Sequence, residues 1–395
     1  MTLTERIFGK DATLVNPAWL CVVAGVLLSL IGVYCIDVGS QMTAPQTPGD
    51  LSARATKHLV FLFAGLIAAA VVAFPDYRKL RFIAWPVLGI CLLLLVFLLI
   101  PFVPSSIVYP RNGVRAWINF GSIDLQPSEL AKIAYVLVMA DYLRVRENHR
   151  TLLGLIPPAI ITAIPMGLIF LQPDLGMAIL FIPVLFAVLV AAGARLKHLL
   201  LVVALATLTA PVAWPLLKPY QRQRVLDAYY AFTDQARIQT ATSTQPETAR
   251  TVLGAGQWGG YPDAQARAVV RYSRLPERHN DMIFAVVVAR FGLVGGLAVI
   301  ALTALWLLGA MLTASFTKDG FGRLLCVGLA TFVFCQVAIN IGMVVGVAPV
   351  IGLTLPFVSY GGSSMIVLWI MTGLIFSIAV RKPNTFAGPA FHFKD

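Results

Sequence analysis

Long apolar runs separated by short polar turns dominate the chain. A helix that crosses a bilayer needs about 20 consecutive apolar residues. Ten runs approach or exceed that length, at 18–36, 58–74, 83–103, 130–143, 152–171, 177–192, 199–217, 282–312, 324–345 and 365–380. The first run lacks a small-residue cleavage site, which indicates a retained helix rather than a signal peptide. The pattern predicts an all-α polytopic membrane protein with one transmembrane domain over 1–395 and ten transmembrane helices.

The eighth run, 282–312, has 31 residues, which is longer than one crossing requires. We expect this helix to tilt in the bilayer or to continue into the cytosol.

Lys and Arg are concentrated in the turns at 77–81, 144–150, 195–197 and 318–323 and at both termini. With ten spans these segments all fall on one side of the membrane, and the positive-inside rule makes that side cytoplasmic. The other side holds most of the polar motifs and a large extracytoplasmic loop at 218–280, between helices 7 and 8. The sequence therefore predicts cytoplasmic termini and a functional face outside.

Composition supports this class: 58% of the residues are hydrophobic and 12% are charged, and the mean hydropathy is +0.82. A single soluble core could not bury so much apolar surface. The net charge of +12 does not indicate a nucleic-acid partner, because no soluble basic domain holds it. The five cysteines lie inside apolar runs without metal-ligand spacing, so neither a disulfide nor a zinc site is expected.

The segment LPERHNDMIF, 275–284, joins the large loop to the eighth run and concentrates ionisable groups: Glu277, Arg278, His279 and Asp281. One interpretation is that Asn280 and Asp281 cap the new helix. Another is that Asp281 is a reactive acid facing a lipid-borne substrate, with His279 as a weaker candidate for proton transfer. We expect Asp281 to have both roles.

The block QPSELAK, 126–132, places Glu129 in the first turn of a helix and Lys132 three residues later on the same face. These two residues suit an intramembrane salt bridge. A second interpretation adds that Lys132 binds a phosphate, together with Arg115 from the preceding block NGVRAWINFG. Arg290, deep in the eighth run, requires a counter-ion, and Glu129 is our candidate.

Two blocks rich in proline and glycine carry further candidates. LQPDLG places Asp174 at a helix start, as a first-turn acid or as a substrate or metal contact. PVIGLTLPFVSYGGSSM, 349–365, is either a tight outer loop or a re-entrant, cavity-lining segment, and its candidate substrate contacts are Ser359 and Ser363.

Basic residues recur in the large loop. The block LKPYQRQRVL places cations just outside the membrane: Lys218, Arg222 and Arg224. A second group has helical spacing: Arg267, Arg271 and Arg274. Such a stripe is either a solvated face or a surface that gathers an anionic lipid.

In type and order these six blocks, spread over 112–364, resemble the SEDS family of bacterial cell-wall proteins (shape, elongation, division and sporulation). The ERH triplet at 277–279 resembles the RodA branch, which serves elongation and rod shape, more than the FtsW branch, which serves division. The resemblance implies a peptidoglycan glycosyltransferase in the bacterial cytoplasmic (inner) membrane that polymerises lipid II at the outer face. It also implies a class B penicillin-binding protein as partner and places the essential acid at Asp281.

Under this resemblance Asp281 is the general base of an inverting transfer in which undecaprenyl pyrophosphate leaves. Arg115, Lys132 and Arg222 or Arg224 would stabilise the pyrophosphate charge. No cofactor is assigned, and a divalent cation (Mg2+ or Mn2+) between Asp281 and the pyrophosphate stays open, although no cluster of acids calls for one. The alternatives are a lipid II flippase and a scaffold for a partner transpeptidase.

The chain departs from the family pattern in several places, including Asn280 where many relatives carry threonine and a thinned glycine-rich run, GAGQWGG. Its arginine block reads Arg115, Ala116, Trp117, with the arginine one place away from the usual position. Ala289 and Arg290 stand where many relatives carry an acidic pair.

Overall fold

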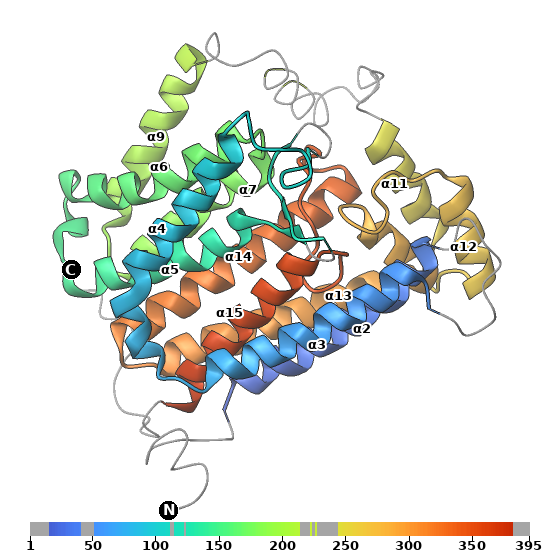
Figure 1. The fold of residues 1–395 in the computed structure, drawn as a ribbon, viewed down its shortest axis with the longest axis horizontal. Coiled ribbons are helices and arrows are strands. Elements are labelled where there is room, and N and C mark those ends of the chain that lie inside the picture. Colours follow the sequence, from blue (N-terminus) through green and yellow to red (C-terminus); the bar gives the residue numbers. More distant parts are fainter. Residues whose placement is uncertain are drawn as a thin grey trace, which may run out of the picture.

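The computed structural model describes residues 16–40, 51–110, 114–121, 124–213, 222, 226 and 244–381. The described chain is mostly helical (Figure 1). Its α-helices are α2 (Ala18–Ser40), α3 (Ala53–Ala73), α4 (Leu80–Leu99), α5 (Pro127–Val145), α6 (Ile156–Leu171), α7 (Leu175–Ile179), α8 (Phe181–Ala191), α9 (Leu196–Ala213), α11 (Thr244–Ala255), α12 (Asp263–Tyr272), α13 (Ile283–Phe316), α14 (Gly320–Val345) and α15 (Gly362–Val380). Short 3-10 helices are η1 (Tyr77–Lys79), η2 (Asn148–Arg150) and η3 (Leu153–Leu155). One antiparallel pair, β1 (Ile118–Asn119) with β2 (Asp124–Leu125), lies between α4 and α5.

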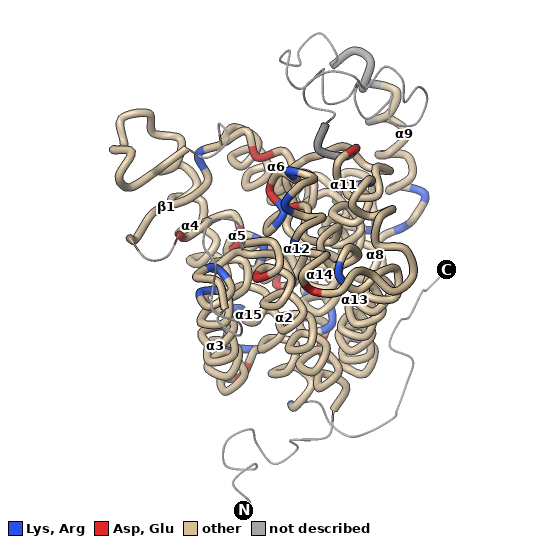
Figure 2. The backbone as a smooth tube through the Cα atoms, turned by 90° about the vertical axis from the view of Figure 1, so that its right-hand side faces the viewer, with Lys and Arg blue, Asp and Glu red and all other residues tan. Residues whose placement is uncertain are grey.

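The prediction of a helical, multi-pass membrane protein is confirmed. Among the described residues, seven helical segments are long and apolar enough to cross a bilayer: α2, α3, η1 with α4, η3 with α6, α13, α14 and α15. Long stretches of these helices carry no charged side chain (Figure 2). The remaining predicted runs lie on α5, on α7 with α8, and on α9. Ten crossings therefore remain a prediction.

Helices distant in sequence pack side by side, notably α3 against α15 and α2 against α13 (Figure 1). Small residues permit this closeness in a membrane bundle. A Cβ on Gly65 of α3 would lie 2.6 Å from the Trp369 ring of α15, and one on Gly373 would lie 2.4 Å from the Ala69 carbonyl oxygen. Helix α5 lies inside the bundle, in contact with α4, α14, α15, α6 and α8. It can carry buried charge because protein rather than lipid surrounds it.

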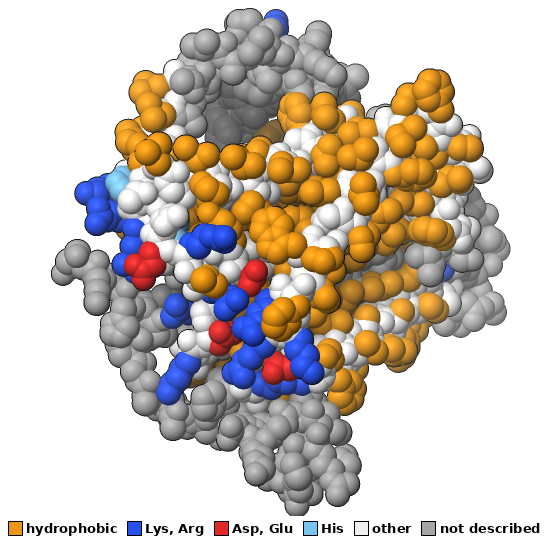
Figure 3. Space-filling model, turned by 60° about the vertical axis from the view of Figure 1, so that its left-hand side comes forward, with side chains coloured by type: hydrophobic (Ala, Val, Ile, Leu, Met, Phe, Trp, Pro, Cys, Tyr) orange, Lys and Arg blue, Asp and Glu red, His pale blue; other side chains and the backbone are white. Residues whose placement is uncertain are grey.

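The basic turns lie together at one end of the bundle. A Cβ on Gly320 would lie 3.7 Å from Cβ of Arg144, and one on Gly193 would lie 3.9 Å from a terminal nitrogen of Arg150. The 3-10 helix η1 contacts α14 and α15, and Arg381 donates to backbone oxygens at the end of α3. Lys and Arg side chains accordingly gather at one end of the face in Figure 3, beside a broad hydrophobic surface. The sequence correctly placed these turns on a common side.

The eighth apolar run is not one continuous helix. Gly292 interrupts α13 with φ 66° and ψ −166°. The loop before α12 fills the break: Tyr261 N–H donates to the Ala289 carbonyl at 2.9 Å, and Leu293 N–H donates to the Gln257 carbonyl at 2.8 Å. Backbone groups freed at membrane depth require such partners. The extra length of this run therefore accommodates a kink, which the sequence-based expectation of a tilted or extended helix did not include.

Candidate functional site

The acid segment, residues 277–282, forms a tight turn before α13. The amides of Asn280 and Met282 both donate to the Glu277 carbonyl, at 2.9 and 3.2 Å. Met282 is the N-cap of α13 and makes no side-chain capping hydrogen bond. The prediction that Asn280 or Asp281 caps this helix is therefore wrong, because the turn places both residues before the cap. Asn280 Nδ2 instead donates to Glu277 Oε2 at 2.7 Å.

Asp281 combines burial with a remaining solvent contact. Its side chain is half-buried, and a Cβ built on Gly352 would lie 3.6 Å from its Oδ2. Burial, followed by the negative charges of Glu277 and Asp174, raises the pKa of the Asp281 carboxyl to about 7. A carboxyl that titrates near neutral pH and retains solvent contact can accept a proton from a bound hydroxyl.

His279 lies beside a group of positive charges. Burial, and then the charges of Arg54 and Arg278, lower the pKa of this histidine to about 4, while Glu277 acts in the opposite direction. The ring is therefore neutral at pH 7, with a buried Nδ1 that makes no hydrogen bond within the described part of the chain. Arg54 was not among the residues predicted from the sequence, because it lies in the first turn of α3, more than 200 positions before the acid segment.

Asp174 is the N-cap of α7, one position before the first turn in which the sequence had placed it. Its Oδ1 accepts from Met177 N–H at 3.1 Å. Its other oxygen accepts from Gln126 Nε2 at 3.3 Å. Burial raises its pKa to about 6, and the charge of Glu129 contributes. A Cβ on Gly176 would lie 2.4 Å from the Ile351 carbonyl oxygen, and one on Gly352 would lie 3.6 Å from Asp281 Oδ2. The structure therefore brings the LQPDLG block near the acid segment.

Glu129 and Lys132 form the predicted intramembrane ion pair, with 2.8 Å between Nζ and Oε2. Lys132 also donates to Gln336 Oε1 at 3.1 Å, and its side chain is only 1% exposed. Direct contact with a phosphate would therefore require this region to open. Gln336 lies one turn before another buried amide, Asn340, and our sequence analysis missed both. The signal was two amides spaced i, i+4 in an apolar run.

The other candidates lie in several places. Arg115 lies just before β1, half-buried, and its buried Nε makes no hydrogen bond among the described residues. Arg222 is half-buried in a helical position, and Arg224 lies outside the described residues. Ser359 Oγ donates to the Asn280 carbonyl at 2.6 Å, while Ser363 is buried in the first turn of α15.

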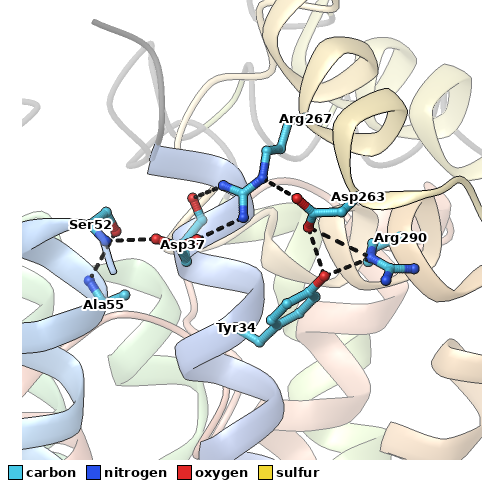
Figure 4. Close-up of polar contacts among 7 residues, drawn as sticks. All are labelled: Tyr34, Asp37, Ser52, Ala55, Asp263, Arg267 and Arg290. Atoms are coloured by element: carbon cyan, nitrogen blue, oxygen red, sulfur yellow. Dashed lines mark hydrogen bonds and ion pairs between the residues drawn. The ribbon is translucent and has the colours of Figure 1, made fainter. Parts of the chain in front are cut away.

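A second polar cluster joins α12 to α2 and α13 (Figure 4). Arg267 pairs with Asp37 and Asp263, at 2.7 Å each. Arg290 donates to the Tyr34 hydroxyl at 2.9 Å and lies 3.9 Å from Asp263 Oδ1. The expected partner of Arg290, Glu129, was therefore wrong, because that acid is already paired within α5.

The predicted basic stripe on α12 also changes. Helix α12 ends at Tyr272, and Arg274 follows it with φ 51°. Arg267 faces the ion pairs of Figure 4, so the three arginines do not form one solvated helical face.

No group of three His, Cys, Asp or Glu side chains within the described part of the chain could hold a metal ion. The acid segment offers the carboxyls of Asp281 and Glu277, and Mg2+ is usually bound by one or two carboxylates together with substrate phosphates rather than by a cage of protein ligands. The residues present therefore do not form a metal cage, and the chemistry below is derived from the protein side chains alone. All five cysteines are free thiols.

Comparison with known proteins adds independent information. A family model described as "Cell cycle protein", covering FtsW, RodA and SpoVE, matches residues 18–384. A probable peptidoglycan glycosyltransferase FtsW of Geobacter metallireducens is 31% identical over 364 residues, which cover 91% of this chain and 94% of the relative. Stage V sporulation protein E of Bacillus subtilis is 30% identical over 366 residues, covering 92% and 97%.

Solved structures share the architecture. A chain from the structure described as "Structural coordination of polymerization and crosslinking by a peptidoglycan synthase complex" is similar with a TM-score of 0.75 and 31% identity, covering 93% of this chain and 98% of that one. The rod shape determining protein RodA of Thermus thermophilus gives a TM-score of 0.65 with 26% identity, covering 92% and 97%.

Proposed function

Because the chain belongs to the FtsW/RodA/SpoVE family, the SEDS proteins, we propose that it is a peptidoglycan glycosyltransferase that polymerises lipid II. The observation that carries this proposal is Asp281, a half-buried carboxyl whose pKa is about 7. It lies before α13, whose far end leads to the basic turn at 318–323. The positive-inside rule places that turn in the cytoplasm. Asp281 then faces outward from the cytoplasmic membrane, and both termini lie inside.

The proposed reaction is an inverting glycosyl transfer. The acceptor sugar hydroxyl gives its proton to Asp281 while its oxygen bonds to the anomeric carbon of the donor. The bond between that carbon and the pyrophosphate oxygen breaks, and the electron pair leaves with undecaprenyl pyrophosphate. A positioned general base contributes about 10²- to 10⁴-fold in rate.

Positively charged side chains would stabilise the charge that grows on the leaving group. Arg115 is the described candidate with a buried Nε free to donate, and Arg222 and Arg224 remain candidates from the large loop. Lys132 is enclosed by Glu129 and Gln336. We therefore propose that Lys132 acts through its charge rather than by touching substrate. One group on which this charge acts is Asp174, whose pKa it lowers.

Two biological roles are compatible with this reaction. The ERH triplet favours a RodA-type role in elongation, whereas the curated relatives above are named FtsW and stage V sporulation protein E. A similar solved chain comes from a complex described as coordinating polymerization and crosslinking. We therefore propose a class B penicillin-binding protein as the partner in either setting. Rescue of cells depleted of RodA, set against rescue of cells depleted of FtsW, distinguishes the two.

The decisive experiment is polymerisation of lipid II in detergent by the purified protein, alone and with a partner whose transpeptidase is inactivated. Asp281→Asn removes the base. The control Asp141→Asn makes the same chemical change near the C-terminal end of α5, where Asp141 pairs with Arg144. We expect glycan strands from the wild type and from Asp141→Asn, but not from Asp281→Asn. Transfer of lipid II across liposomes without strands would support the flippase instead.

A further inference from the structure

Three successive backbone carbonyls of the acid segment accept hydrogen bonds from residues outside the segment. The His279 carbonyl accepts from Tyr360 N–H at 2.8 Å. The Asn280 carbonyl accepts from Ser359 Oγ at 2.6 Å, and the Asp281 carbonyl accepts from Asn340 Nδ2 at 2.8 Å. Ser359 and Tyr360 belong to the segment 349–365, which the sequence singled out for its irregular backbone, whereas Asn340 lies on α14.

Each of the two side-chain donors is fixed by a second bond. Asn340 Nδ2 also donates to the Leu353 carbonyl at 2.6 Å, so both N–H groups of this amide are used. Ser359 Oγ accepts from Leu355 N–H at 2.7 Å. Asn340 is fully buried and Ser359 is 6% exposed. Asn340 and Ser359 therefore each link the acid segment to residues 353–355, and the two links fix the distance between these segments.

The same arrangement brings backbone against the reactive carboxyl. Gly352 has φ 71°, a conformation that favours glycine, and a Cβ there would lie 3.6 Å from Asp281 Oδ2. One turn earlier on α14, Gln336 Nε2 donates to the Thr354 carbonyl at 3.0 Å. Residues 352–354 are thus anchored to α14 directly beside the acid.

We propose that Asn340 and Ser359 are positioning residues, which hold the Asp281 carboxylate in its reactive geometry by fixing the backbone carbonyls of Asn280 and Asp281. The inference rests on the proposed function, since it assigns to these residues the placement of the proposed base. A displacement of about 1 Å in such a group costs about 10²-fold in rate. Ser359 then serves the reaction through the acid segment rather than by touching substrate.

The test uses four variants in the full-length protein, the fourth being the conservative Ser359→Thr. Asn340→Leu removes both amide donors at similar volume, and Ser359→Ala removes one hydroxyl donor. The matched control is Thr372→Val, which removes a buried hydrogen bond between Trp306 Nε1 and Thr372 Oγ1, 3.2 Å long, that joins α13 to α15. We measure kcat and KM for lipid II, the thermal midpoint, and hydrogen exchange of the Tyr360 amide.

Both positioning variants should lose about 10- to 100-fold in kcat, with KM changed less than about twofold. Thr372→Val should retain the wild-type kcat at a comparable thermal midpoint, and Ser359→Thr, which keeps the hydroxyl, should recover most of the kcat lost in Ser359→Ala. Wild-type kcat in both positioning variants would overturn the proposal, as would a rise in KM alone. If Asn340→Leu fails to fold, the comparison of Ser359→Ala with Ser359→Thr decides.

Hydrogen exchange separates this proposal from the proposed function. The Tyr360 amide bonds the His279 carbonyl, so releasing the acid segment should speed its exchange about tenfold in Asn340→Leu and Ser359→Ala. Unchanged exchange in both variants overturns the positioning role. Faster exchange in a protein whose wild type makes no glycan strands supports the anchoring and overturns the glycosyltransferase.

Discussion

Replacing Asp281 by Asn should abolish polymerisation and at the same time stabilise the fold. The pKa of this carboxyl rises from 3.8 to about 7 in the folded protein. Between these two values the unfolded chain ionises first, so the carboxyl increasingly disfavours folding as the pH rises from about 4 to about 7. The full penalty is about 4 kcal/mol, at about 1.36 kcal/mol per pH unit. Asn has the same shape and no charge, so it removes the penalty.

The assay compares thermal unfolding of the wild type and Asp281→Asn in the same detergent at several pH values. We expect the midpoint of the variant to be roughly 5 °C higher at pH 7.5 and the difference to vanish near pH 4, where both side chains are neutral. Lipid II polymerisation should fall by at least about 10²-fold. A variant that is less stable than the wild type at pH 7.5, or whose advantage does not depend on pH, would refute the reasoning.

Three further predictions follow from the same structure. The kcat/KM for lipid II should increase with pH through about 7, as the Asp281 carboxyl loses its proton; a flat profile between pH 6 and 8 would remove Asp281 as the base. Lys132→Met leaves Glu129 buried without its partner and should cost about 3–5 kcal/mol of stability, which Lys132→Met combined with Glu129→Gln should largely restore in a denaturation assay. Gly292→Ala places a Cβ 2.2 Å from the Trp258 carbonyl oxygen at a positive φ and should lower the thermal midpoint by several degrees; an unchanged midpoint would contradict the kink.

The ion pair within α5 shows what a sequence can fix locally. Glu129 and Lys132 are three residues apart on one helix, so their pairing follows from helix geometry alone, and the structure confirms it. The sequence also placed Asp174 at a helix start, and the structure makes it the N-cap of α7. Partners across the fold were beyond this reasoning: Arg290 meets Tyr34, which is 256 positions away.

The acid segment shows the opposite case. Its composition predicted a reactive role for Asp281, but the capping role predicted for it was wrong, because a tight turn makes Met282 the N-cap and starts the helix at Ile283. The residues that anchor this segment, Asn340 and Ser359, lie 59 and 79 positions from the carbonyls they bond. No local pattern specifies which carbonyl an amide at the end of α14 will meet.

The sequence by itself determined that this chain is a helical membrane protein of the SEDS family, with its basic turns on one side. These properties follow from hydropathy, from charge counts and from motifs read in order, which need no knowledge of packing. Only the tertiary structure decided how α13 bends at Gly292, which charges pair across α2, α12 and α13, and what holds Asp281 in place. Those features depend on contacts between segments far apart in the chain. Such contacts form only when the helices pack, so no local sequence pattern specifies them.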